Sequence, residues 1–218
     1  MTPYYTALAL GYSVAIPAVI GLVRLRITEP AYRPFIFIMW LGLINHTVSI
    51  VANRMIGSNA INSNIYVLFE ALLYLVLFYN WRVVGRSQKP YLVTAVLLAF
   101  LWTADNFLFH SITVTNSFYR IVCSLVLLFF AITKLTGLIV SSSKRLLRDA
   151  RFLICTGIII YFSFKATMEV FFLTGVRVSA SFQIKIFFIM IFVNLFVNLI
   201  FAVAAVCIPR KQPFMPLP

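Results

Sequence analysis

The feature of this sequence that most constrains its fold is a series of long apolar runs, each about 20 residues long. A helix of that length spans the hydrocarbon core of a bilayer, because each residue adds about 1.5 Å along the helix axis. A transmembrane β-barrel would instead show shorter segments in which apolar and polar residues alternate, whereas these runs are continuously apolar. The pattern therefore predicts an all-α fold, a polytopic integral membrane bundle.

Seven such runs, bounded by charged residues, Pro or Gly, predict seven transmembrane helices. They extend from Pro3 to Val23, Pro34 to Asn53, Asn64 to Val84, Tyr91 to Phe109, Ser117 to Ile139, Phe152 to Thr174 and Ile184 to Ile208. The first run is followed by Arg24 and Arg26 rather than a small-residue cleavage site, so we interpret it as a retained helix. We expect residues 1–208 to form one transmembrane domain and residues 209–218 a short Pro-rich cytoplasmic tail.

Composition agrees with lipid as the solvent of this chain. Hydrophobic residues make up 62% of the sequence and charged residues 11%, whereas soluble domains are about half apolar and about a quarter charged. The chain is also basic, with 18 Lys and Arg against 5 Asp and Glu. Nucleic-acid-binding proteins gather basic residues in a polar surface patch, but here they separate apolar runs. We therefore expect no nucleic-acid partner.

The basic residues predict the orientation of the bundle, because Lys and Arg of short loops accumulate on the cytoplasmic side. The links after the first, third and fifth spans and the C-terminal tail contain Arg24, Arg26, Arg33, Arg82, Arg86, Lys89, Lys144, Arg145, Arg148, Arg151, Arg210 and Lys211. The other side has Arg54, Arg120, Arg177 and Lys185. We expect the N-terminus outside and the C-terminus in the cytoplasm, in a multi-pass protein of the plasma membrane or inner membrane.

The densest group of basic residues admits a second interpretation besides topology. Lys144, Arg145, Arg148 and Arg151 follow one another within eight positions. Such a group is also suited to contact anionic lipid or an acidic partner, either a membrane protein or a cytoplasmic one.

Ionisable residues inside the spans are the best pointers to function, because each costs at least a few kcal/mol near the middle of a bilayer. Of the 5 acidic residues, Glu70, Asp105 and Glu169 lie inside predicted spans, on the outer side of the membrane centre. His46 lies on the same side, and Lys165 lies close to the midplane. We expect these residues to line a polar cavity that opens to the outside.

Helical spacing indicates which polar residues share a face. Lys165 and Glu169 are four positions apart, which predicts an ion pair along one helix. His46 and Asn53 belong to a polar stripe on the second span, and Asn194 lies at the middle of the last one. With Arg120 at the outer end of the fifth span, the candidate ligand-binding residues are His46, Asn53, Glu70, Asp105, Arg120, Lys165, Glu169 and Asn194.

A purely structural interpretation of these charges stands beside the functional one. Glu70 and Asp105 would then be held in interhelical ion pairs with Arg120, Lys165 or Lys185 that fix how the helices pack. The chain has 3 Cys and 2 His, and their spacing does not match a zinc site. We therefore expect neither a metal nor a cofactor.

Seven spans with an outer N-terminus resemble the topology of rhodopsins and other seven-helix receptors. A retinal protein needs a Lys for the Schiff base near the middle of the last span. Here Lys185 lies at the outer end of that span and Asn194 lies in its middle. The resemblance is therefore one of topology, and it does not extend to retinal.

The leading hypothesis is a membrane receptor or sensor, in which a small molecule or a lipid headgroup enters from the outer side and the signal passes to a separate partner. An intramembrane lipid-modifying hydrolase is an alternative, with Asp105 or Glu70 as general base and His46 assisting. An ion-coupled small-molecule transporter would use Lys165, but the apolar inner half offers no polar route. A structural subunit of a membrane complex is the last alternative. No nucleophile is recognisable, so the sequence favours a protein that is not an enzyme.

Overall fold

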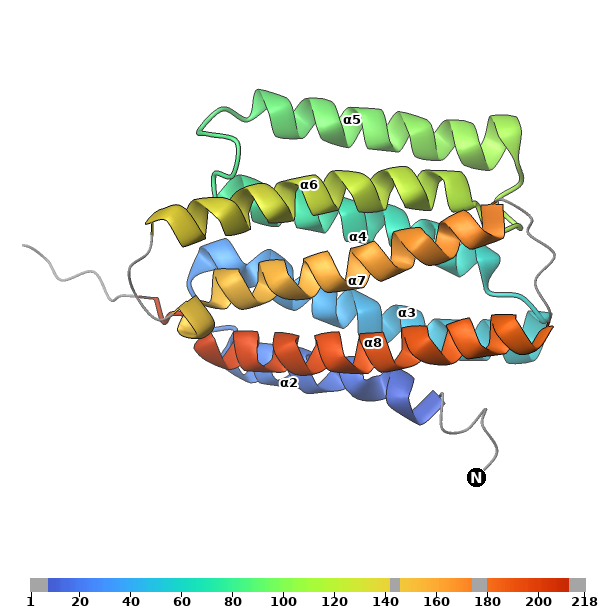
Figure 1. Cartoon of the computed structure of the whole chain (residues 1–218), viewed down its shortest axis with the longest axis horizontal. Helices are drawn as coiled ribbons and strands as arrows, with labels where there is room; N and C mark the ends of the chain where they lie inside the picture. Colours follow the sequence, from blue (N-terminus) through green and yellow to red (C-terminus); the bar gives the residue numbers. More distant parts are fainter. Residues whose placement is uncertain (1–7, 142–145, 174–179, 212–218) are drawn as a thin grey trace, which may run out of the picture.

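The computed structural model describes residues 8–141, 146–173 and 180–211, and in these ranges the chain forms an all-α bundle, as predicted (Figure 1). The first helix, Leu8–Arg24, contains a 3₁₀ turn at Tyr12–Val14 followed by α2 (Ala15–Arg24). The other helices are α3 (Arg33–Ile56), α4 (Ala60–Asn80), α5 (Lys89–Thr103), α6 (Ser117–Ser141), α7 (Ala150–Leu173) and α8 (Ala180–Cys207).

Six of these helices are long and apolar enough to cross a membrane, so the chain is a multi-pass membrane protein. The first helix, Leu8–Arg24, is apolar but shorter. The span predicted there began at Pro3, and residues 3–7 lie outside the described part of the chain.

One predicted helix end is wrong, and one span ends where predicted but changes its helix type. The third span was expected to reach Val84, but α4 ends at Asn80 because Arg82 has a positive φ of 52°. This left-handed conformation is incompatible with a continuing α-helix. The fourth span changes at Ala104 into a π-helix, Ala104–Phe109, which ends with a bond from His110 N to Asp105 O of 3.1 Å.

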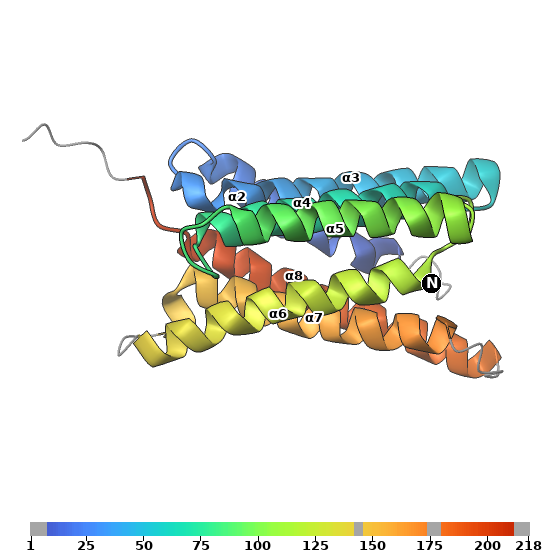
Figure 2. The same cartoon turned by 90° about the horizontal axis from the view of Figure 1, so that it is seen from above.

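The helices form two layers. In Figure 1, α6, α7 and α8 lie in front of α4, α3 and α2 respectively, and Figure 2 shows the same two layers from above. Within this arrangement α7 packs against both α6 and α8, while α2 packs against both α3 and α8. Helix α5 lies at the edge of the bundle, where it contacts α4 and α6.

The two ends of the bundle differ in charge. One end, called the basic end here, carries the links α2–α3, α4–α5 and α6–α7 and the chain after α8 (Figure 1). Its described basic residues are Arg24, Arg26, Arg33, Arg82, Arg86, Lys89, Arg148, Arg151, Arg210 and Lys211, whereas Lys144 and Arg145 lie outside the described residues. The opposite end carries Arg54, Arg120 and Lys185, and Arg177 is not among the residues described there. The charge difference agrees with the predicted topology, although the side of the membrane that each end faces stays a prediction.

The half of the bundle toward the basic end is filled by aromatic side chains. Tyr74 contacts Phe162 with ring centroids 5.6 Å apart, and Phe78 contacts Phe130 at 5.5 Å and Trp81 at 6.2 Å. The exposed fraction of Trp81 is 7%, and the other four rings are at 4% or less. These rings come from α4 and the residue after it, from α6 and from α7, and they pack against one another between the polar half of the bundle and the basic end.

The first and last helices are fastened together at the basic end. The Arg24 guanidinium donates hydrogen bonds of 3.1 Å to the carbonyls of Ala205 and Ile208, where α8 ends. Carbonyls at a helix C-terminus lack partners within the helix and carry partial negative charge, which favours a cation there. Thr28 and Arg210 form an isolated antiparallel bridge beside this contact. The predicted tail therefore starts as a segment paired with the first link, and its residues 212–218 lie outside the description.

Arg24→Gln should lower the free energy of unfolding by about 1–2 kcal/mol, because the end of α8 loses its cationic cap. Arg26→Gln removes the same charge from an exposed neighbour and should have little effect. Titration of the micelle-bound protein with sodium dodecyl sulfate, followed by circular dichroism, compares the two. Equal losses in both variants would show that the cap contributes nothing beyond net charge.

Candidate functional site

A buried ion pair joins α4 to α7. The Lys165 ammonium donates a hydrogen bond of 3.0 Å to Glu70 Oε2, and the Tyr66 hydroxyl donates one of 2.7 Å to Glu70 Oε1. The exposed fractions of Glu70 and Lys165 are 3% and 7%. The ammonium also lies 5.3 Å and 5.1 Å from the ring centres of Tyr161 and Phe162, which stabilise a cation through their π-faces. These contacts offset the free-energy cost of burying the two charges.

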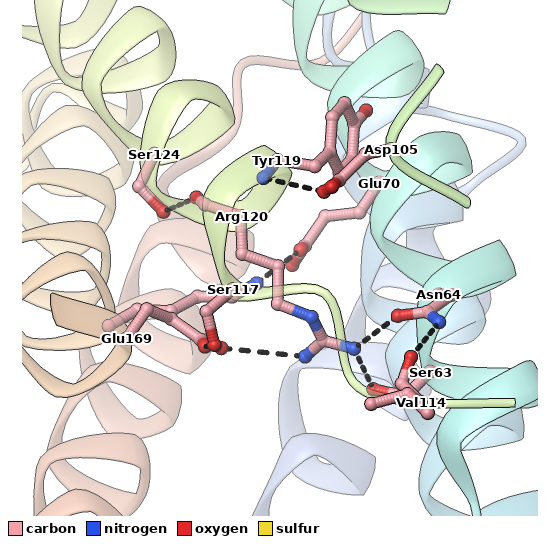
Figure 3. Close-up of polar contacts among 11 residues, drawn as sticks. Ser63, Asn64, Glu70, Asp105, Val114, Ser117, Tyr119, Arg120, Ser124 and Glu169 are labelled. Atoms are coloured by element: carbon pink, nitrogen blue, oxygen red, sulfur yellow. Dashed lines mark hydrogen bonds and ion pairs between the residues drawn. The ribbon is translucent and has the colours of Figure 1, made fainter. Parts of the chain in front are cut away.

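Arg120 connects three helices from its position on α6 (Figure 3). Its Nη1 lies 3.6 Å from Oε1 of Glu169 on α7, and the Ser117 hydroxyl donates a bond of 2.7 Å to the other oxygen of that carboxylate. On the opposite side, Nη2 donates to Ser63 Oγ at 2.8 Å and to Asn64 Oδ1 at 3.0 Å, both at the start of α4. The planar guanidinium thereby holds α4, α6 and α7 at a fixed spacing.

Asp105 has a different role, because it links the end of α5 to the start of α6. Its Oδ2 accepts a hydrogen bond of 3.0 Å from the backbone N–H of Tyr119, and its Oδ1 lies 2.9 Å from His110 Nδ1. The first N–H groups of a helix need acceptors, so the carboxylate acts as a cap for α6. Asn116 donates a 2.9 Å bond to Asn106 next to it. The π-helix is what turns Asp105 and Asn106 toward α6.

Two cavities lie between the helices above the Glu70–Lys165 pair, away from the basic end. The deep cavity has a volume of about 130 Å³, and it is lined by residues that include Glu70, Tyr66 and Asn198. The wide cavity has a volume of about 550 Å³ and reaches Asn53 and Asn59 where α3 gives way to α4. They have five lining residues in common, so they adjoin: Gly11, Asn45, His46, Tyr161 and Asn194. Polar groups from α3, α4, α7 and α8 therefore converge on one space.

His46 lies at the junction of the two cavities and is held tightly there. Its ring meets Tyr12 edge to face, with centroids 4.7 Å apart, and a Cβ added at Gly11 would overlap the imidazole. Only glycine therefore fits at position 11 without displacing the ring. Among the residues described, His46 Nε2 is buried and finds no hydrogen-bond partner. A buried nitrogen without a partner costs free energy, and a guest in the cavity could satisfy it.

The eight candidate residues fall into three groups in the structure. Lys165 and Glu169 were expected to pair with each other, but each pairs across helices, with Glu70 and Arg120 respectively. The first group lines the cavities and consists of His46, Asn53, Glu70 and Asn194, with Lys165 behind Glu70. The second is the interhelical pair of Arg120 and Glu169. The third is Asp105, which caps α6. That any of them binds a ligand stays a prediction.

Several residues of the site escaped the sequence analysis. Tyr66 lies four positions before Glu70, and Tyr161 lies four before Lys165, so helical spacing alone would have found both on the polar face. Ser63 and Asn64 resemble ordinary residues of a helix start, and no local pattern reveals that they bind Arg120. Such contacts depend on which helix lies opposite.

The basic group proposed for partner contact is engaged in part within the chain. Arg151 Nη2 donates a 2.9 Å bond to Asp149 Oδ2, while Arg148 is exposed and Lys144 and Arg145 lie outside the described ranges. Burial raises the pKa of Asp149, but the hydrogen bonds from Arg151 lower the pKa by more, so it lies below its usual value. The carboxylate therefore stays charged and holds Arg151 at the start of α7.

Comparison with protein-family models, with curated proteins and with solved structures finds no match to this chain. Its chemistry must therefore be argued from the site. Both oxygens of Glu70, Glu169 and Asp105 are already engaged by protein groups. A general base must take up a proton, and each of these carboxylates would do so at the expense of the contacts that it makes.

The Glu70–Lys165 pair should show strong coupling in a double-mutant cycle. Lys165→Met alone should lower the free energy of unfolding by about 3–5 kcal/mol, because it leaves a buried carboxylate without its cation. The double variant Glu70→Gln/Lys165→Met should lose less than the sum of the two single variants.

The same detergent titration measures all four states of this cycle. Phe164→Leu, at a side chain that is 43% exposed beside Lys165, is the control for changes on this turn of α7. Additive losses would mean that the two charges do not stabilise one another.

Proposed function

We propose that this membrane protein is a receptor or sensor that binds a small ligand in the deep and wide cavities and signals through a separate cytoplasmic or membrane partner. The observation that carries the proposal is the convergence of amide, hydroxyl and imidazole groups from four helices on one space. In a bilayer such groups are costly unless they are satisfied. A polar space in an otherwise apolar bundle therefore indicates an occupant, either water or a ligand.

The route from the cavity to the basic end supports a signalling role. The cavity wall includes α8, whose far end is capped by Arg24, and α7, which starts at the Asp149–Arg151 contact. A ligand that changes the spacing of α7 and α8 would alter these contacts, since packed helices move as rigid elements. At the basic end, exposed residues such as Arg148 offer positive charges that an acidic partner can bind.

The structure disfavours two alternatives and supports one. The aromatic cluster of Tyr74, Phe78 and Phe162 blocks the path that a transporter needs. A general base takes up a proton, and protonation of Glu70 would remove the charge that pairs with Lys165, which argues against a hydrolase. A structural subunit remains a second candidate, because Glu70 and Glu169 each have a cationic partner and interhelical packing alone would explain them. Access of water to the cavities distinguishes this candidate from the receptor.

Thiol labelling measures that access. In a background with Cys123, Cys155 and Cys207 replaced by Ala, Ser49→Cys places a thiol in the wide cavity. It should react with a membrane-impermeant maleimide added from outside, since the predicted topology opens the cavity to that side. Val48→Cys is the matched control, because Val48 is 42% exposed on the adjacent surface of the same helix, where lipid shields it.

Reaction at both positions or at neither would contradict a water-filled cavity. Reaction of Ser49→Cys only from the cytoplasmic side would show that the predicted orientation is wrong.

A receptor must also transmit events in the cavity to the basic end. Asn194→Trp fills the cavity in place of a ligand, and it should change amide hydrogen exchange in residues 146–149 at the start of α7. Phe192→Trp adds the same side chain at a position that is 59% exposed on the outer surface of α8, and it should leave that exchange unchanged. Identical exchange in the two variants would support the structural subunit.

A further inference from the structure

We propose that the ligand is an uncharged, hydroxyl-bearing lipid, whose head occupies the deep cavity and whose hydrocarbon chain occupies the wide cavity. This inference rests on the proposed ligand-binding function and adds the chemical class. The two volumes, about 130 Å³ and about 550 Å³, suit a small head joined to a larger tail. Ligand sites of this kind combine an apolar wall with a few polar groups that orient the bound molecule.

The charge of the wall excludes a charged head. Among the described residues that line the two cavities, Glu70 is the charged one, and the Lys165 ammonium beside it balances that charge. A phosphate would need a cation with donors to spare, as Arg and Lys provide in phosphate sites. Arg120 lines neither cavity, and its Nη atoms are held by Glu169 and by the start of α4. A cationic head would in turn find no negative charge without a partner among these described lining residues, because Lys165 neutralises Glu70.

The hydrogen-bonding groups of the wall match hydroxyls. Asn45 and Asn194 present amides, Tyr74 and Tyr161 present hydroxyls, and His46 presents a ring nitrogen that lacks a partner among the described residues. Amides and hydroxyls both donate and accept, and a hydroxyl of the ligand does the same. A head that carries one or two hydroxyl groups can therefore satisfy several of these groups together.

One part of the wall of the wide cavity is apolar and continues onto the lipid-facing surface, while amide and hydroxyl side chains line much of the rest. Ile50 on α3 and Phe188 and Ile191 on α8 line the cavity. Their sequence neighbours Val51 and Phe192 are 49% and 59% exposed and face outward. The cavity edge thus borders the bilayer along both helices. A hydrocarbon chain can pass from the bilayer to this part of the wall at little cost, because the wall is as apolar as lipid tails. A water-soluble ligand has no chain to place there.

A binding experiment with three matched probes tests the class of ligand. The probes are 1,2-dioctanoylglycerol, glycerol as its head alone, and dioctanoyl phosphatidic acid with the same chains and a charged head. Native mass spectrometry of the full chain released from micelles measures their affinities. Dioctanoylglycerol should bind at least about tenfold more tightly than either of the other probes, which corresponds to about 1.4 kcal/mol.

Substitutions test whether dioctanoylglycerol binds in the cavities. Asn194→Leu removes an amide at nearly constant volume, and it should weaken dioctanoylglycerol binding about tenfold. Phe192→Leu, on the lipid-facing side of α8, should leave binding unchanged. Tyr161→Phe removes only a hydroxyl from the wall, so it provides the same test if Asn194→Leu folds poorly.

The other outcomes separate this inference from the function on which it rests. Glycerol binding as tight as that of dioctanoylglycerol would overturn the lipid class and leave the receptor proposal standing. Tighter binding of phosphatidic acid would overturn the uncharged head. If no probe binds although Ser49→Cys is labelled from outside, the inference fails alone, and if that labelling also fails, both proposals fail.

Discussion

The interhelical ion pairs are the interaction on which the rest of this bundle depends. Helices surrounded by lipid gain little from burying apolar side chains against one another, because lipid tails are equally apolar. Polar contacts therefore decide which helices meet and at what height. Lys165 with Glu70 sets the height of α7 against α4, and Arg120 with Glu169 sets that of α6 against α7. Without these pairs each charge would stand alone in an apolar interior, so the arrangement that satisfies both pairs is strongly preferred.

The number of helices and most of their limits were predictable, because the bilayer demands about 20 apolar residues whatever their detailed order. Local backbone features were not. Hydropathy does not mark where Arg82 turns the chain, since Trp81 and Val83 flank it, and the polar residues beside Ala104 do not distinguish a π-helix from an α-helix. Helical spacing correctly placed Lys165 and Glu169 on one face of α7, but it could not show that α4 and α6 lie opposite that face.

Charged side chains and neutral amides lie in different parts of the site for a physical reason. A buried charge needs a permanent partner, because leaving it alone costs several kcal/mol. A neutral amide such as that of Asn194 loses much less when unpaired, so it can line a space that is filled only part of the time. The charges accordingly lie at the floor of the cavities and in the Arg120–Glu169 pair, while Asn45, His46 and Asn194 form the walls. From the sequence, His46, Glu70, Arg120 and Asn194 were all expected to line one cavity.

The fastening of α2 to α8 makes the last helix a lever. Its fulcrum is the end that Arg24 caps, and its arm runs along α7 and the cavity wall toward the opposite end. Helix α8 has 28 residues, so this arm is about 42 Å long. A tilt of about 5° at the fulcrum would sweep the far end through about 4 Å, more than the width of a methylene group, while the capped end stays in place. Such a tilt would change the distance between α3 and α8 where both line the wide cavity.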